Sequence, residues 1–229
     1  MARVLVLREA EDAARTADVL RAHGHEPLLL PLQEVRPLDP PLEGGPFGGF
    51  LATSAHAAPW LARHAAGTAL PVLAVGERTA EALRAAGLPE VVAGPGRARD
   101  LPALAARLPS GDAPLVYAAG RTRLPDLEAG LLAADVRFRT LEVYDMVERR
   151  PGEDELDRLT ESGPPDAVLL LSRGQAALFE ALAARRPGLR PAALRHLCLS
   201  SAVADGLSPG RVAEWPAEPS LDALLARLG

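Results

Sequence analysis

The feature that most limits how this chain can fold is an internal repeat with a circularly shifted order. Three segments of one half resemble three segments of the other half, and they occur in the same order along the chain. The pairs are 51–63 with 169–182, 73–83 with 197–207, and 99–108 with 220–228. The remaining unit, residues 116–138, has its counterpart at the N-terminus, in residues 4–27. The N-terminal unit therefore belongs with the C-terminal half, which predicts two lobes and a first lobe built from both ends of the chain.

Two long extended segments are predicted to connect these lobes. Residues 136–150 (VRFRTLEVYDMVERR) have a β-prone composition and exceed an ordinary strand of about five or six residues. A second segment, residues 26–38, contains prolines that prevent a helix. Two crossings predict a cleft between the lobes. The predicted boundaries are 1–36 and 149–229 for the first lobe, and 37–148 for the second.

Short apolar runs alternate with segments of helical spacing along the chain. The predicted strands are 3–7, 28–30, 50–53, 72–75, 90–93, 115–118, 136–139, 167–171, 196–199 and 211–215. The predicted helices are 11–23, 57–64, 77–86, 100–108, 124–134, 153–161, 175–184, 202–207 and 221–228. Pro59 must lie in the first turn of its helix, and Asp100 is the predicted N-cap of another. This alternation predicts an α/β protein with parallel sheets covered by helices on both faces.

Composition narrows the class of protein. Hydrophobic residues make up 48% of 229 residues, which is enough for two cores. A net charge of −5 is the wrong sign for a general nucleic-acid binder. The single cysteine, Cys198, excludes an internal disulfide framework and suits a reducing compartment. No signal peptide is recognised, and no apolar run approaches the roughly 20 residues of a membrane span. We therefore expect a cytoplasmic protein without nucleic-acid or membrane partners.

The residues that follow each predicted strand are the candidates for a binding site. In open parallel sheets, ligands bind beyond the carboxyl ends of the strands, where helix N-termini present unpaired amides. These residues are hydroxyls, glycines and arginines with one carboxylate, a set that suits an anionic ligand. They include Arg8, Thr53, Ser54, Gly76, Glu77, Arg78, Thr79, Gly120, Arg121, Thr122, Arg123, Ser172, Arg173, Gly174, Ser200 and Ser201. Any single Ser, Thr or Gly among them is better explained as a helix cap. The hypothesis of an anion-binding site therefore rests on the set as a whole.

Other chemistries lack their motifs. The sequence has no GxxxxGK[ST] loop for nucleotide triphosphates and no GxGxxG turn for dinucleotides. Five histidines show no HExxH pattern, so no zinc site is predicted. Ser54 and His56 lack the GxSxG context of a nucleophile and its base. The acidic residues Glu9, Glu11 and Asp12 fall in a first helical turn, where they offset the helix dipole.

Tyr144, one of two tyrosines, lies in the long segment 136–150. A phenol with a pKa of about 10 stays protonated and can donate a proton to a leaving hydroxyl. The alternative is a ring that packs on the segment with its hydroxyl in water. The residues alone favour neither role.

Over essentially its whole length the chain resembles the uroporphyrinogen-III synthase family. The matching segments are VLVLRE, LATSAHAA, LAVGERTAEALRAAG, GRTRLPDLEAGLLAADVRFRTLEVYDM, LLLSRGQAALFEAL and LCLSSAVADGL. Their order and spacing carry the resemblance. It implies two doubly wound, flavodoxin-like α/β lobes joined by a two-stranded ladder, the first lobe discontinuous. It also implies a monomer that acts on a small molecule without a metal or organic cofactor.

The resemblance implies conversion of linear hydroxymethylbilane to uroporphyrinogen III. Water is lost, the macrocycle closes and the last pyrrole ring is inverted. By motif match, Tyr144 is implied to assist departure of the hydroxyl, and Thr53, Ser54 and Thr79 are implied to be cleft residues. With the strand-end candidates, this predicts a substrate-binding set: Arg8, Thr53, Ser54, His56, Gly76, Arg78, Thr79, Arg123, Ser172, Ser200 and Ser201.

The chain departs from the family pattern at several positions. Only Arg8 remains of the Thr-Arg-Pro that often follows the first strand, Leu171 replaces a threonine, and Val203 lacks the expected hydroxyl. His56 stands where the family often has Arg or Asn. Two other functions stay open: a non-catalytic two-lobe module for a small anion, and a paralogue that kept the fold as an interaction protein.

Overall fold

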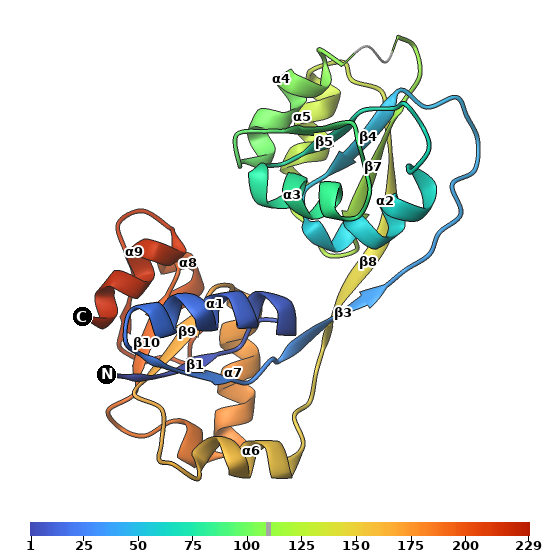
Figure 1. Cartoon of the computed structure of the whole chain (residues 1–229). Coiled ribbons are helices and arrows are strands. Elements are labelled where there is room, and N and C mark those ends of the chain that lie inside the picture. Colours follow the sequence, from blue (N-terminus) through green and yellow to red (C-terminus); the bar gives the residue numbers. More distant parts are fainter. Residues whose placement is uncertain (109–110) are drawn as a thin grey trace. The chain divides into compact units, whose positions relative to one another are not determined.

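The computed structural model describes residues 1–108 and 111–229, and the chain divides into two compact units (Figure 1). Unit 1 comprises Met1–Glu34 and Val147–Gly229, and unit 2 comprises Val35–Met146. The first unit is thus built from both ends of the chain and the second from its continuous middle. The predicted domain boundaries, 1–36 with 149–229 and 37–148, stay a prediction.

A five-stranded parallel sheet forms the centre of unit 1, in the order β2-β1-β9-β10-β11. Its strands are β1 (Arg3–Val6), β2 (Glu26–Leu29), β9 (Ala167–Leu170), β10 (Arg195–Cys198) and β11 (Ala213–Glu214). β9 is buried along its whole length because a central parallel strand is covered on both faces. Counted within the unit, the order is 2-1-3-4-5, which is the flavodoxin-like doubly wound order.

Helices cover both faces of this sheet (Figure 1). They are α1 (Ala10–Ala22), α6 (Glu153–Thr160), α7 (Arg173–Arg185), α8 (Ser201–Ala204) and α9 (Leu221–Leu225), with 3₁₀ turns at Pro187–Leu189 and Ala226–Leu228. Leu20 of α1 and Leu224 of α9 pack on one face. Leu156 of α6, Phe179 of α7 and Val203 of α8 pack on the other. Each face therefore has its own apolar core.

Unit 2 contains a six-stranded sheet in the order β3-β8-β7-β4-β5-β6. Its strands are β3 (Gln33–Pro37), β4 (Gly49–Ala52), β5 (Val72–Ala74), β6 (Val91–Ala93), β7 (Leu115–Gly120) and β8 (Phe138–Glu148). The neighbouring pairs from β8 to β6 are parallel. β3 lies beside β8 at the edge, and both strands cross the boundary between the units. These two strands are the predicted two-stranded ladder.

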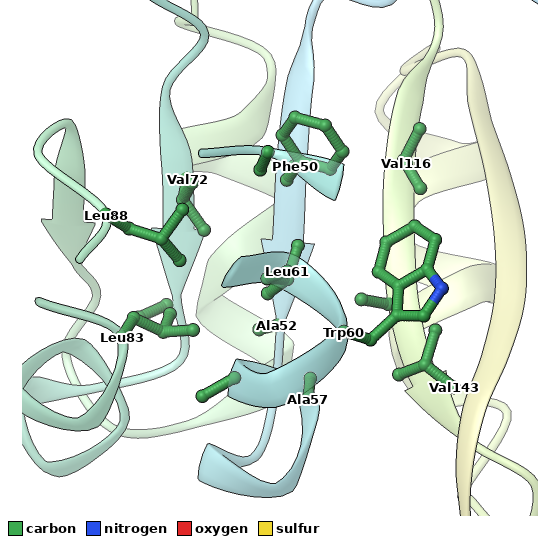
Figure 2. Packing of buried hydrophobic residues seen from close by; sticks show 14 of the residues in the cluster. Phe50, Ala52, Ala57, Trp60, Leu61, Val72, Leu83, Leu88, Val116 and Val143 are labelled. Carbon is green, nitrogen blue, oxygen red and sulfur yellow. The ribbon is translucent and has the colours of Figure 1, made fainter. Parts of the chain in front are cut away.

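The helices of unit 2 also cover both faces of its sheet. They are η1 (Ala55–Ala57), α2 (Ala58–His64), α3 (Glu77–Ala85), η2 (Ala98–Asp100), α4 (Leu101–Ala105) and α5 (Asp126–Ala133). Leu101 of α4 and Leu127 of α5 pack on one face. On the other face, Figure 2 shows Trp60 of α2 beside Val116 of β7 and Val143 of β8. The indole N–H of this buried tryptophan donates to the carbonyl of Pro40 (3.0 Å), so no polar atom of the ring is stranded in the core.

Several local predictions differ from the structure. The predicted extended connector 26–38 is confirmed, although it is divided into two strands: the chain leaves the first sheet at Leu29 and enters the second at Gln33. The eleven-residue β8 confirms the predicted long extended segment 136–150 and continues well beyond the strand predicted at 136–139, whereas the predicted strand 211–215 is only the two-residue β11. The predicted helix 100–108 is the shorter α4, and Asp100 at its N-cap makes no side-chain capping bond within the described residues. Pro59 does lie in the first turn of α2, as predicted.

Candidate active site

The carboxyl edge of the second sheet gathers most of the candidate residues in unit 2. β4, β5 and β7 run in parallel and in register, so their carboxyl ends meet at one edge. Thr53 and Ser54 follow β4, Gly76 follows β5, and Gly120 ends β7. The turn η1 after β4 also contacts α3, the helix that follows β5. The edge is therefore a continuous row of strand-to-helix turns.

Tyr144 lies on β8 next to this row, with only 9% of its surface exposed. The ring of His56 meets the Tyr144 ring edge-on, with 5.4 Å between the centroids and 67° between the planes. Burial raises the pKa of Tyr144, and a hydrogen bond with the Ser54 hydroxyl partly offsets that rise. The phenol is therefore protonated at neutral pH and can donate a proton to a leaving group.

Ser54 has two roles in this arrangement. Its hydroxyl oxygen accepts a hydrogen bond from the backbone N–H of His56 (3.3 Å) and so caps η1. The same side chain interacts with the phenol of Tyr144. The capping interpretation of Ser54 is thus confirmed, and the contact with Tyr144 adds a link that a cap alone does not have.

Tyr117 is a residue that the sequence analysis missed. It lies on β7, is 3% exposed, and its hydroxyl is 3.1 Å from the hydroxyl of Thr53. Tyr117 packs with the core on one face of the sheet, and Tyr144 packs with the core on the other. Successive side chains of an extended chain alternate between faces, so Thr53 meets one tyrosine and Ser54 the other. One signal in the sequence could have indicated Tyr117: it is one of two tyrosines, and it lies shortly before the candidate turn that starts at Gly120.

Arg123 does not present a free guanidinium to this edge. Its side chain contacts Glu128 of α5 (3.1 Å) and Glu142 of β8 (3.3 Å). It also donates to the carbonyls of Gly120 and Arg121, both at 3.2 Å. These contacts hold the turn after β7 in place, and a substrate contact of Arg123 stays a prediction.

Carboxylates on β8 and α5 change the charge balance that the sequence indicated. Arg121 pairs with Glu142 (3.0 Å) and with Asp145 (3.1 Å), and Asp145 also contacts Arg36 (3.2 Å). The Arg121 hydrogen bond lowers the pKa of Glu142, so this partner is ionised at neutral pH. The turn after β7 carries arginines, as the sequence indicated, but acids of β8 and α5 pair with both of them. The strand pairing that brings these acids across is not visible in the residues that follow the strands.

Gly76, Arg78 and Thr79 form the start of α3. Gly76 is the N-cap, and within the described residues no side chain caps this helix. A Cβ atom on Gly76 would lie 2.9 Å from Cα of Gly96, so the loop after β6 crosses too closely for any side chain there. Thr79 is buried and Arg78 is exposed. Gly76 has no side chain that could cap α3, and a helix start of this kind suits a carboxylate ligand.

The four candidates in unit 1 lie at the carboxyl edge of the first sheet. Arg8 follows β1 and pairs with Asp12, and its guanidinium also donates to the Thr16 hydroxyl (3.3 Å). Ser172 accepts from the backbone N–H of Gln175 (3.1 Å) and so caps α7. Ser200 is at the N-cap position of α8 without a capping bond among the described residues, and Ser201 begins that helix. The capping interpretation of Ser172 is confirmed, and substrate roles for the four stay predictions.

The acidic residues after β1 occupy the start of α1, as predicted. The Glu9 carboxylate accepts from the backbone N–H groups of Asp12 (2.7 Å) and Glu11 (3.1 Å). Glu9 is buried, and Asp12 is paired with both Arg8 and Arg15. A carboxylate of the chain itself therefore takes the place at this helix end that an external anion would need.

Two doubly wound sheets with hydroxyls and a protonated phenol at a strand edge define an α/β protein suited to a polar substrate. The model of the family described as uroporphyrinogen-III synthase HemD matches residues 14–226. The chain therefore belongs to the uroporphyrinogen-III synthase family, a family of cyclising lyases of tetrapyrrole biosynthesis. The resemblance in the sequence is thereby confirmed.

Solved structures of two synthases share the fold. The uroporphyrinogen-III synthetase of Helicobacter pylori 26695 is 18% identical with a TM-score of 0.68, covering 100% of this chain and 98% of that one. A mutant uroporphyrinogen III synthase of the extremely thermophilic bacterium Thermus thermophilus is 21% identical with a TM-score of 0.51, covering 100% and 96%. No curated protein sequence matches the chain. In the described residues, every helix is too short or too polar to cross a membrane.

Proposed function

We propose that this chain closes hydroxymethylbilane to uroporphyrinogen III, with Tyr144 as the acid that protonates the departing hydroxyl. Family membership supports the reaction. The observation that carries the role of Tyr144 is its burial beside Ser54 and His56, which keeps the phenol protonated at the strand edge. A phenol held in this way supplies a proton where a hydroxide leaving group would otherwise be expelled.

The first step removes water from the substrate. The C–O bond of the hydroxymethyl group breaks as the pyrrole nitrogen supplies its electron pair, and the oxygen leaves with the proton from Tyr144. The electrophilic azafulvene that remains is attacked by the substituted α-carbon of the terminal ring. The resulting spiro-pyrrolenine fragments and recloses with that ring inverted, and the proton lost on closure restores the phenol. Catalysis is then mainly the positioning of a reactive intermediate.

Hydrogen-bond donors along the edge are proposed to hold the substrate's acetate and propionate groups. In unit 2 these are the hydroxyls of Thr53, Ser54 and Thr79, the imidazole of His56, Arg78, and the amides that follow Gly76. The uncapped start of α3 supports this assignment most directly. Arg123 contributes less because its guanidinium is already paired. In unit 1 we propose Arg8, Ser172, Ser200 and Ser201.

We also propose that the protein acts as a cytoplasmic monomer without a nucleic-acid partner. The net charge of −5 weighs against a polyanionic partner. The single, buried Cys198 fits a reducing compartment.

The test is a product analysis. The protein is incubated with hydroxymethylbilane, and the type I and type III isomers are separated by chromatography. We expect mostly type III, against type I alone in a control without enzyme. Type I alone in the presence of the protein would overturn the proposal. Tight binding of hydroxymethylbilane without enzymatic conversion would instead support the non-catalytic binding module.

A further inference from the structure

Gly120, the last residue of β7, lies directly against the phenol of Tyr144. A Cβ atom on Gly120 would stand 2.7 Å from Cζ and 2.8 Å from the hydroxyl oxygen of Tyr144. Real Cβ contacts are not this short, so any side chain here would force the phenol to move. The backbone of Gly120 does not adopt a positive φ. The glycine is therefore needed for space and not for a special backbone conformation.

An irregularity in strand pairing aims Tyr144 at this space. β7 and β8 pair regularly up to Ala119 opposite Glu142, and the next pair is Gly120 opposite Tyr144. The extra residue on β8 is Val143, which makes this a bulge in a parallel pair. Beyond it, the backbone N–H of Arg121 donates to the carbonyl of Tyr144 (2.9 Å), so pairing resumes at once. Bulges redirect side chains, and this one brings the Tyr144 ring over the end of the neighbouring strand.

The remaining sides of the phenol are also defined. The His56 ring meets the Tyr144 ring edge-on, and the Ser54 hydroxyl bonds with the phenol. Both residues belong to the turn after β4, which neighbours β7 in the sheet. The phenol is thus bounded by the turn after β4 and by the bare backbone of Gly120. Of these boundaries, the one formed by Gly120 depends on the absence of a side chain.

We propose that Gly120 is a positioning residue for Tyr144, and that its empty side-chain position sets where the phenol delivers its proton. This inference rests on the proposed function for its catalytic consequence, although the placement of the phenol can be tested without activity. A misplacement of about 1 Å at a reacting group can cost on the order of 100-fold in rate. If the reactive intermediate is not held in position after the hydroxyl leaves, spontaneous closure to the type I isomer is also favoured. Gly120 therefore influences both turnover and the identity of the product.

The test variant is Gly120→Ala, with Gly130→Ala as its matched control. Gly130 lies on α5 of the same unit, and a Cβ there would stand 2.8 Å from Cγ of Pro102, away from Tyr144. We expect Gly120→Ala to lower turnover by on the order of 100-fold and to raise the share of type I isomer. Gly130→Ala loses stability but keeps the turnover and isomer ratio of its folded fraction. Equal turnover and isomer ratio in Gly120→Ala and wild type would overturn the proposal.

A readout independent of activity uses the small number of tyrosines. In a Tyr117→Phe background, Tyr144 is the sole tyrosine, and its ionisation is followed by ultraviolet absorbance. We expect Gly120→Ala to push the ring toward solvent and to lower the pKa of Tyr144 toward its ordinary value of about 10. An unchanged titration would mean that the phenol has not moved, which would overturn the proposal. Wild type producing only type I would defeat the proposed function while leaving this titration as a valid test of the placement.

A rescue experiment covers the case in which Gly120→Ala folds poorly. Tyr144→Ala removes the ring that the new methyl group would strike. The double variant Gly120→Ala/Tyr144→Ala is therefore expected to melt at the same temperature as Tyr144→Ala alone. If Gly120→Ala lowers the melting temperature equally in both backgrounds, the glycine serves the turn itself and the proposal is wrong.

Discussion

The two units have the same strand order but different strand ends. β8-β7-β4-β5-β6 in unit 2 corresponds, strand for strand, to β2-β1-β9-β10-β11 in unit 1. This is the circular shift that the sequence repeat predicted. Thr53 of unit 2 corresponds to Leu171, Thr79 to Val203 and Tyr117 to Val6. A common fold therefore carries hydroxyl chemistry at one sheet edge and apolar residues at the equivalent places of the other.

The difference extends to the helix starts. α1 of unit 1 is capped by the buried Glu9 carboxylate, whereas its counterpart α5 in unit 2 has Pro125 at its N-cap and no capping side chain among the described residues. Unit 1 also has helix α6 before β9, where unit 2 has the proline-rich loop before β4. The two units are therefore similar scaffolds, and unit 2 has more helix starts without a capping side chain among the described residues.

Deletion of residues 1–34 gives the largest expected effect. It removes β1, which lies between β2 and β9, together with α1, which covers one core of unit 1. We expect unit 1 to lose protected backbone amides while unit 2 keeps them, because all strands of its parallel set remain. Hydrogen exchange measures both, and in a Trp215→Phe background the fluorescence of the buried Trp60 reports on unit 2 alone.

Expression of residues 37–148 alone provides the matched control for this deletion. That fragment is expected to fold cooperatively with a buried Trp60. A deletion variant that unfolds throughout, or an unfolded fragment, would show that the units do not fold as separate domains and would break the comparison.

Tyr144→Phe is expected to slow turnover by about 100-fold or more, the range of a lost general acid. The ring and its packing remain, so the folded fraction and the melting temperature should change little. Tyr117→Phe is the comparison variant: it removes the other phenol, on the opposite face of the same sheet, and should slow turnover far less than Tyr144→Phe. Steady-state rates with hydroxymethylbilane decide the matter. A wild-type rate in Tyr144→Phe would leave that tyrosine a packing role only.

Thr53→Val makes unit 2 resemble the apolar position of Leu171 in unit 1. It leaves the Tyr117 hydroxyl buried without its partner, which costs about 1–3 kcal/mol. In a Tyr117→Phe background the same substitution should cost far less, because there is then no hydroxyl to strand. Denaturant unfolding of the four proteins gives the coupling. Equal costs in both backgrounds would mean that the Thr53–Tyr117 contact contributes nothing to stability.

The repeat made the architecture predictable, but the site required contacts that sequence patterns do not encode. Apolar periodicity and the order of repeat units are local signals, so the strands and their neighbours followed from them. Glu142 and Asp145 reach Arg121 only through the register of β8 against β7. The bulge opposite Gly120 shifts that register by one residue, and a shift of one residue reverses the face of every side chain beyond it. Such pairings depend on geometry between distant segments, which is why Tyr117 was missed and why the contact of Gly120 with Tyr144 was not predicted.

The smallest expected effect is a change in pH dependence from His196→Val, which gives unit 1 the residue that unit 2 has at Val72. His196 is buried, and its Nε2 atom has no hydrogen-bond partner among the described residues. The groups that face it are the Phe179 ring, the Val212 backbone, Glu180, Arg190 and Arg211.

Burial lowers the pKa of His196, although the charge of Glu180 opposes this shift. The unfolded chain, with a histidine pKa of about 6.5, therefore binds a proton that the folded chain resists. Stability falls as the pH drops from about 6.5 toward the lower folded pKa. His196→Val should change stability at pH 8 by less than about 1.5 kcal/mol and should make this acid-side loss shallower. Urea unfolding across this pH range measures both, and an unaltered slope would show that His196 does not contribute to the acid sensitivity of unit 1.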